Sequence, residues 1–173
     1  RQRLGLPNLL LHRATTMGIF EIQPPLSKAL SHSFRYLATR PRSEFELTQY
    51  LLRKHSPEIV DATLKVLQDK GLIDDHKFAH LWVQSRLANK PRSSFVIAKE
   101  LHVKGVIKEA IESALHEADD SASAYKAVRK FTRRLSTSST TEFQRKSWQF
   151  LRRRGFSSSV IRDTLATLQN TRS

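Results

Sequence analysis

The sequence predicts an all-α protein made of three tandem three-helix repeats that form an elongated, curved molecule. Three observations favour this fold. The chain has only five glycines and six prolines in 173 residues, and from residue 27 onward they fall at the ends of apolar-periodic segments. Patterns typical of helix N-termini precede several of these segments. The chain also aligns with itself at a period near 50 residues.

We expect residues 1–26 to be a disordered or non-native leader. The chain begins with Arg rather than Met. Pro7, Pro24 and Pro25 would interrupt a long helix, because proline lacks the backbone N–H and clashes with the preceding turn. The apolar run around Leu10 is too short for a signal peptide.

The first predicted repeat covers residues 27–73. Its middle helix begins after Ser43, because Ser43 and Glu46 have the spacing of a capping box, in which each side chain binds a backbone N–H near the other residue. Its third helix begins at Pro57, since proline is well tolerated at the first helical position. Gly71 is expected to end that helix.

The second predicted repeat covers residues 74–117. Asp74 and Asp75 supply a capping oxygen and negative charge at the N-terminus of its first helix. Phe78 and Trp82 fall on one apolar face of this helix. Gly105 is expected to stop the middle helix.

The third predicted repeat covers residues 118–170. Asp119 and Asp120 again place an acidic pair before a helix. Thr-Glu-Phe-Gln at 141–144 predicts a second capping box, at the start of the middle helix. Gly155 is the corresponding stop.

The internal similarity is strongest where the three middle helices end. Pro-Arg-Ser at 41–43 recurs at 91–93. A unit of about 45 residues is near the lower limit for an independent core, so neighbouring repeats should cover part of each other's apolar surface. In each repeat a Leu is followed three positions later by a basic residue and then by a stop: Leu51, Lys54 and His55; Leu101, Lys104 and Gly105; Leu151, Arg154 and Gly155.

The charge of the chain predicts a polyanionic partner. Thirty Lys and Arg against sixteen Asp and Glu give a net charge of +14 and a pI near 10.6. Such a surplus suits nucleic acid or an acidic protein surface. The third repeat is the most basic, with one cluster at 129–134 and another at 145–154.

Nine basic residues are our candidates for contact with this partner. We expect Arg129, Arg133, Arg152 and Arg153 to make most of the electrostatic contact. The large aromatic side chains are instead expected in the core. The nine candidates are Arg42, Arg86, Arg92, Lys104, Arg129, Arg133, Arg152, Arg153 and Arg154, and the expected core aromatics are Phe78, Trp82, Phe131, Trp148 and Phe150.

No motif predicts catalysis, a cofactor or a metal ion. The chain has no phosphate-binding glycine loop and no HExxH pattern, and the absence of cysteine excludes thiolate chemistry. His76 and His80 have metal-ligand spacing on a predicted helix but no convincing third ligand. We therefore predict a non-enzymatic protein. No apolar run approaches the roughly eighteen residues of a membrane span, and we expect a cytoplasmic monomer.

Four sequence blocks, taken in order and with their spacing, are more specific than any one motif. Over residues 31–168 the chain resembles the RecX family, the bacterial regulators of the RecA recombinase. The blocks are Arg35-Tyr36-Leu37 with Arg40-Pro41-Arg42-Ser43, Gly71-Leu72-Ile73-Asp74-Asp75 with Phe78-Ala79 and Arg86, Lys99-Glu100-Leu101 with Lys104-Gly105-Val106, and Phe150-Leu151-Arg152-Arg153-Arg154-Gly155-Phe156.

The resemblance implies a crescent of three-helix units and a non-enzymatic activity. It implies that the protein binds RecA filaments on single-stranded DNA, lies along their groove and inhibits strand exchange, ATP hydrolysis and co-protease activity, in DNA repair and the SOS response. Binding to single-stranded DNA alone would be weak and non-specific. His55 departs from the family pattern, in which glycine usually closes the first middle helix.

The residues alone leave two other functions open. A DNA-binding helical protein with helix-turn-helix-like units would act independently of recombinase and bind bare DNA tightly. A structural repeat adaptor for another acidic protein would be indifferent to both recombinase and DNA.

Overall fold

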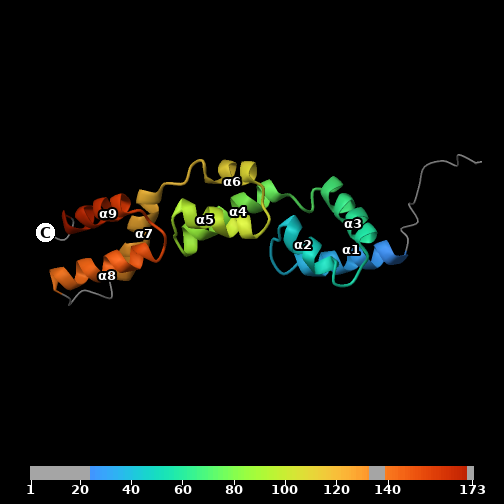
Figure 1. Ribbon diagram of the computed structural model, residues 1–173, viewed down its shortest axis with the longest axis horizontal. Coiled ribbons are helices and arrows are strands. Elements are labelled where there is room, and N and C mark those ends of the chain that lie inside the picture. The colour runs from blue at the N-terminus through green and yellow to red at the C-terminus, as the bar shows by residue number, and fades with distance from the viewer. Residues whose placement is uncertain (1–23, 133–138, 171–173) are drawn as a thin grey trace, which may run out of the picture.

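The computed structural model describes residues 24–132 and 139–170, which are helical and contain no β-strand. Three groups of three helices follow one another along one long axis, with the N-terminal group at one end and the C-terminal group at the other (Figure 1). The predicted all-α fold, an elongated row of three-helix repeats, is confirmed.

The three helices of each repeat pack on one another. The first repeat contains α1 (Pro24–Leu37), α2 (Glu44–Leu51) and α3 (Pro57–Asp69). The second contains α4 (Asp75–Asn89), α5 (Ser94–Val103) and α6 (Lys108–Leu115), and the third contains α7 (Asp120–Thr132), α8 (Thr140–Arg152) and α9 (Ser158–Asn170).

Several helix starts follow from side-chain caps. Ser43 and Glu46 form the predicted capping box at α2, and Pro57 is the first residue of α3. The expected box at Thr141 is wrong. Ser139 is the N-cap of α8, because its hydroxyl stands three residues before Glu142 and accepts that residue's N–H at 3.3 Å.

The first helix begins earlier than the sequence predicts. α1 starts at Pro24, three residues before the expected boundary at residue 27. Pro24 and Pro25 occupy its first turn, where the backbone N–H groups have no partner within the helix. Proline therefore costs little at these two positions, although it would break a helix further along.

Each repeat encloses its own apolar core. Phe78 and Leu101 are buried in the second repeat, with 4% and 0% of their surface exposed. The other predicted core aromatics are only partly buried and pack at the edges of these cores: Trp82, Phe131, Trp148 and Phe150.

Consecutive repeats meet head to tail through their middle helices. At the first joint, where the N-terminal end of α2 meets the turn after α5, the Ser43 hydroxyl donates to the Lys104 carbonyl oxygen at 2.6 Å. At the second joint, where the N-terminal end of α5 meets the turn after α8, the Ser93 N–H donates to the Arg154 carbonyl oxygen at 3.1 Å. Both serines are completely buried.

The repeated acidic pairs support these joints. The first Asp of each pair caps its own helix: Asp74 accepts the N–H of Lys77 at 3.0 Å, and Asp119 accepts the N–H of Ser121 at 2.7 Å. The second Asp reaches back to the preceding repeat. Asp75 accepts the N–H of Glu44 at 2.9 Å, and Asp120 accepts the N–H of Ser94 at 2.7 Å. Each joint therefore satisfies a helical N–H that would otherwise need water.

Two glycines allow the close approach at the joints. Gly105 and Gly155 have φ values of +76° and +86°, in the left-handed region. A Cβ added to Gly105 would collide with the Phe45 side chain, and one added to Gly155 would collide with Val96. Gly71 also has a positive φ, +64°, but a Cβ there would have no neighbour within 4 Å.

The contrast between these glycines predicts a difference in stability. Gly71→Ala should lower the free energy of unfolding by about 1–2 kcal/mol, because only left-handed strain is added. Gly155→Ala adds overpacking, which typically costs a further ~1–3 kcal/mol. Urea unfolding followed by circular dichroism measures both. Equal losses in the two variants would show that the second joint tolerates an extra methyl group.

Burial of Phe78 gives a second prediction. Phe78→Ala should lower the free energy of unfolding by about 3–5 kcal/mol, since it removes a ring from the core of the second repeat. Thermal unfolding measures the change. A variant that melts like the wild type but no longer binds its partner would contradict a purely structural role.

Candidate functional site

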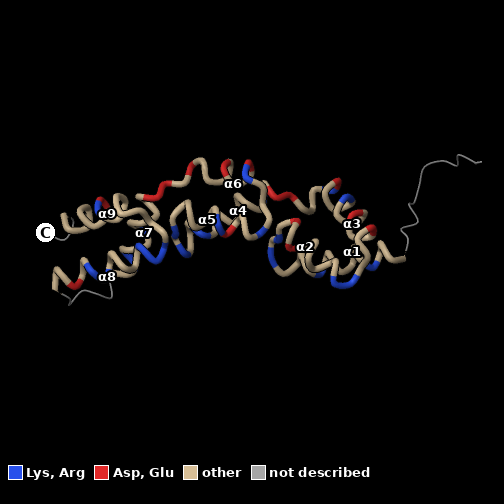
Figure 2. The backbone as a smooth tube through the Cα atoms, in the orientation of Figure 1, with Lys and Arg blue, Asp and Glu red and all other residues tan. Residues whose placement is uncertain are grey.

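Charge is separated between two sides of the molecule. The first and middle helices with their turns, over 24–55, 75–105 and the described part of 120–155, carry twenty basic and six acidic residues. The third helices α3, α6 and α9 carry three basic and six acidic residues. We call the side formed by the first and middle helices the basic face, and Figure 2 shows it running along all three repeats.

Three of the predicted contact residues lie exposed on this face. Arg129 on α7, Arg152 at the end of α8 and Arg153 in the following turn are all exposed. None of them forms an ion pair with a described acidic residue. Arg133, the fourth residue expected to dominate, lies outside the described residues. An anion could reach all three without displacing an internal partner.

Other predicted residues are held over aromatic rings. The Arg42 guanidinium lies 4.0 Å from the centre of the Tyr36 ring. In the second repeat, Arg86 and Lys104 each lie 4.4 Å from the centre of the Trp82 ring. These cation–π contacts fix the cations in place but leave them charged.

Arg86 and Arg92 share one carboxylate. Arg86 Nε lies 2.6 Å from Glu100 Oε2, which also accepts the Trp82 indole N–H at 2.9 Å. Arg92 Nη1 lies 3.5 Å from Glu100 Oε1. One negative charge thus faces two guanidinium groups. The Nε atoms of Arg92 and of its counterpart Arg42 are buried without a hydrogen-bond partner among the described residues.

Glu46 neutralises cations at the first joint. It bonds the Arg40 guanidinium at 2.8 and 3.0 Å and Lys104 Nζ of the next repeat at 2.8 Å. Burial would raise the pKa of Glu46, but the hydrogen bonds from Arg40 and Lys104 outweigh it and lower that pKa to about 2. Lys104 is therefore committed to an internal ion pair, and its role is at least partly structural.

The second joint has no such carboxylate. Val96 takes the place that Glu46 has in the first repeat, so Arg154 donates instead to the Pro91 carbonyl oxygen at 3.0 Å. Burial, together with the charges of Arg92 and Arg153, lowers the pKa of Arg154 from its ordinary value. The structure thus brings Arg92, Arg153 and Arg154 close enough to interact as a group of like charges.

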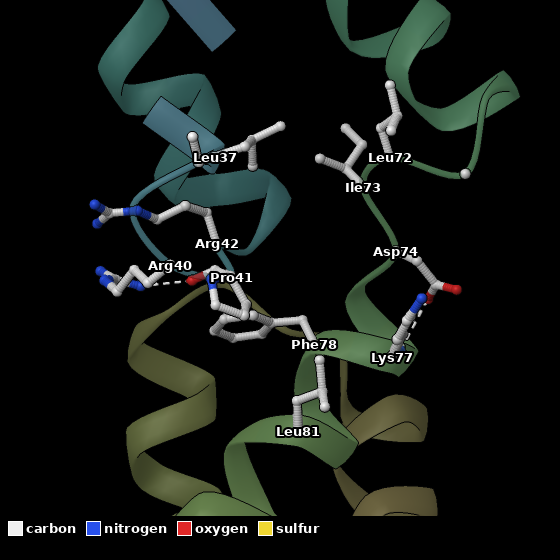
Figure 3. Close-up of a pocket in the computed structure, with 12 residues that line it drawn as sticks. Leu37, Arg40, Pro41, Arg42, Leu72, Ile73, Asp74, Lys77, Phe78 and Leu81 are labelled. Carbon is white, nitrogen blue, oxygen red and sulfur yellow. Dashed lines mark hydrogen bonds between the residues drawn. The ribbon is translucent and has the colours of Figure 1, made fainter. Parts of the chain in front are cut away.

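A hollow opens beside each joint, between the turn that precedes the middle helix and the first helix of the next repeat. The first hollow, of about 330 Å³, has a largely apolar lining (Figure 3). Leu72 and Leu81 remain 48% and 42% exposed there. Its lining includes Leu37, Ile73 and Phe78, with Arg40 and Arg42 on one side and Asp74 and Lys77 on another.

The second hollow, of about 240 Å³, has a basic lining. It contains no acidic side chain, and its two aromatic members are Phe131 and Phe150. Its cations are Lys90, Lys126, Lys130 and Arg154. Our candidate set contains only the last of these.

Lys90 and Lys126 are absent from the candidates predicted from the sequence, because neither belongs to a dense run of charge. Two signals were present. Lys90 aligns with Arg40 fifty residues earlier, immediately before a Pro-Arg-Ser motif. Lys126 stands four residues before Lys130, so the two share one face of α7.

The described residues contain no group of three or more His, Cys, Asp or Glu side chains that could hold a metal ion. No helix formed by them has the length and apolar character needed to cross a membrane.

The lowered pKa of Glu46 predicts acid sensitivity of the first joint. A folded-state pKa below the unfolded value means that ionised Glu46 stabilises the fold above about pH 4.5, and that this contribution disappears as the pH falls toward 2. Glu46→Gln should therefore be less stable than the wild type at pH 6, and the difference should shrink as the pH approaches 2. Thermal unfolding across this range measures it.

Glu142→Gln is the matched control for this experiment. Glu142 forms an ion pair with Lys146 at 2.7 Å within α8, and such surface pairs contribute little. Its removal should change the melting temperature much less at pH 6. Equal stability of Glu46→Gln and wild type at that pH would contradict the structural role of Glu46.

Comparison with known proteins agrees with this architecture. Family models for the first, second and third three-helix domains of RecX match residues 29–67, 74–115 and 118–165. A protein of Chlorobium phaeobacteroides named regulatory protein RecX is 36% identical over 139 residues, which are 80% of this chain and 91% of that protein. One of Mycolicibacterium smegmatis with the same name is 37% identical over 140 residues, covering 76% and 74% of the two chains.

Solved structures extend the likeness to the fold. The crystal structure of RecX from Lactobacillus salivarius superposes with a TM-score of 0.71 at 23% identity, over 84% of this chain and 97% of that one. A second crystal structure, of a regulatory protein RecX, gives a TM-score of 0.69 at 28% identity, over 81% and 72%. With all three domain models and curated relatives above 30% identity in agreement, this chain belongs to the RecX family.

Proposed function

We propose that this chain is a non-enzymatic regulator of the RecA recombinase, active in DNA repair and the SOS response. It binds recombinase filaments on single-stranded DNA and inhibits strand exchange, ATP hydrolysis and co-protease activity. Membership of the RecX family supports recombinase as the target. Single-stranded DNA alone is a weak, non-specific ligand, and the regulator works in the cytoplasm as a monomer without a membrane partner.

The basic face is the observation that carries this proposal. It extends over three repeats that the two joints hold in a fixed order, so the cations form a long array rather than a local patch. A filament on DNA offers a matching series of phosphates and acidic protein groups. Attraction between such surfaces speeds docking and weakens with salt, because the Debye length is about 8 Å at physiological ionic strength.

ATP hydrolysis by RecA on single-stranded DNA provides the test. Wild-type protein should inhibit at concentrations well below that of the recombinase, under conditions where it scarcely binds bare DNA. The double variant Arg152→Glu/Arg153→Glu should require at least about tenfold more protein, equivalent to ~1.4 kcal/mol. Both arginines are exposed and form no ion pair with a described residue, so the variant should fold normally.

Lys65→Glu/Lys70→Glu is the matched control, because it makes the same change of charge on α3 and at its C-cap, outside the first and middle helices. It should inhibit almost as well as the wild type. Unchanged inhibition by the Arg152/Arg153 variant would refute their role in contact. If the wild type leaves ATP hydrolysis unchanged yet binds bare DNA tightly, the chain is a DNA-binding protein that acts independently of recombinase.

A further inference from the structure

The second hollow combines four cations with a complete absence of acidic side chains. Lys90 comes from the turn after α4, Lys126 and Lys130 from α7, and Arg154 from the turn after α8. They therefore converge from two repeats. The three lysines are exposed and Arg154 is half-buried, so their charges reach solvent.

The equivalent hollow at the first joint shows that the fold itself does not require this charge. Leu81 and Phe78 of α4 line the first hollow where residues of α7 line the second. The first hollow also contains Asp74. In the first joint Glu46 bonds both neighbouring cations, whereas Val96 stands at the matching place in the second. The first hollow is thus lined by three cations, Arg40, Arg42 and Lys77, together with one acidic residue and a carboxylate partner for Arg40, whereas the second has four cations and no acidic residue.

The four cations that line the second hollow have no carboxylate partner among the described residues. Arg154 finds only a backbone carbonyl as its hydrogen-bond acceptor, and Lys90, Lys126 and Lys130 form no ion pair with a described residue. Gathering like charges without a counter-charge is unfavourable. A bound anion would remove this repulsion and would accept hydrogen bonds from both repeats.

We propose that the second hollow binds a phosphodiester group of single-stranded DNA. This inference rests on the proposed function and assigns one of its DNA contacts. The ligand is a phosphate because several cations converge on one small space and the exposed apolar side chains that would anchor a protein segment belong to the other hollow. Basic side chains are the usual partners of DNA phosphates.

Phe150 supports Arg154 and leaves no free face on which a base could stack. Phe131 and Phe150 stack with ring centres 4.2 Å apart, and the Arg154 guanidinium lies 4.4 Å from the centre of the Phe150 ring. Two groups cannot share one face of the ring at these distances, so both faces of Phe150 are occupied. Contact through the phosphate alone predicts binding without base preference.

Salt-dependent binding to a fluorescein-labelled oligo(dT) tests this proposal. One phosphate on a single strand contributes about −0.7 to the slope of log K against log salt concentration. Lys126→Gln/Lys130→Gln should weaken binding and make the slope shallower by about that amount. Lys65→Gln/Lys70→Gln, which removes the same charge from the opposite side, should retain the wild-type slope. Circular dichroism would verify that both variants fold.

The other outcomes separate the possible ligands. Equal slopes for all three proteins would overturn the proposal. A Lys126/Lys130 variant that binds oligo(dT) normally but no longer inhibits recombinase would also overturn it, because this result would mean that an acidic protein surface occupies the hollow. Inorganic phosphate is the second probe. In the remaining outcome, phosphate raises the melting temperature of the wild type alone while the oligo(dT) slopes of all proteins stay the same. That result would identify free phosphate as the ligand and would overturn the proposal.

Failure of this proposal is distinguishable from failure of the proposed function. RecA ATP hydrolysis is measured with the same proteins. If the wild type does not inhibit recombinase but the Lys126/Lys130 variant alone has a shallower slope, the phosphate site is supported and the filament role is wrong.

Discussion

One contact, used at both joints, holds the molecule together. In it, the glycine turn after one middle helix packs against the N-terminal end of the middle helix in the preceding repeat. Each repeat has a core too small to stand comfortably alone. At each joint a buried serine and an aspartate from the following repeat form hydrogen bonds with backbone groups at the helix ends. A glycine in the left-handed region allows the two helices to approach closely enough for these bonds. The same contact sets the order of the repeats and so makes the basic face continuous.

The two joints use one backbone arrangement with different side chains. Glu46 pairs with Arg40 and Lys104 at the first joint, and apolar side chains make up most of the lining of the hollow beside it. Val96 stands at the matching place in the second joint, and the hollow beside that joint is lined by four cations and no acidic residue. The cations that remain available to a partner therefore concentrate toward the third repeat, where Arg152 and Arg153 are also exposed. A regular scaffold thus presents different chemistry along its length.

Much of the fold could be predicted because its local signals repeat. Caps, stops and apolar positions coincide in each unit, and the family blocks agree with them. The purpose of the Pro-Arg-Ser motif and of the acidic pairs could not be predicted, because their partners lie in the neighbouring repeat. His55 closes the corresponding turn of the first repeat. Among the described residues no earlier repeat packs against this turn, and His55 Nε2 lies 2.9 Å from Nδ1 of His32.

The candidate site was predicted less completely than the fold. Charge density along the sequence identified Arg152 and Arg153, which are exposed, but it could not distinguish them from Lys104, whose charge is committed to Glu46. Lys90 and Lys126 line the same hollow only because the second joint brings their two repeats together. The order of residues in the sequence does not reveal this tertiary contact.

Small-angle X-ray scattering of the whole chain measures whether the two joints hold the three repeats in an extended row. A compact globule of this length would have a radius of gyration of about 16 Å. The stacked repeats predict a value of about 20 Å or more, above that compact scaling, with a distance distribution skewed toward long distances. A value near the compact one would mean that the repeats fold back on each other, and a continuous basic face would then not exist.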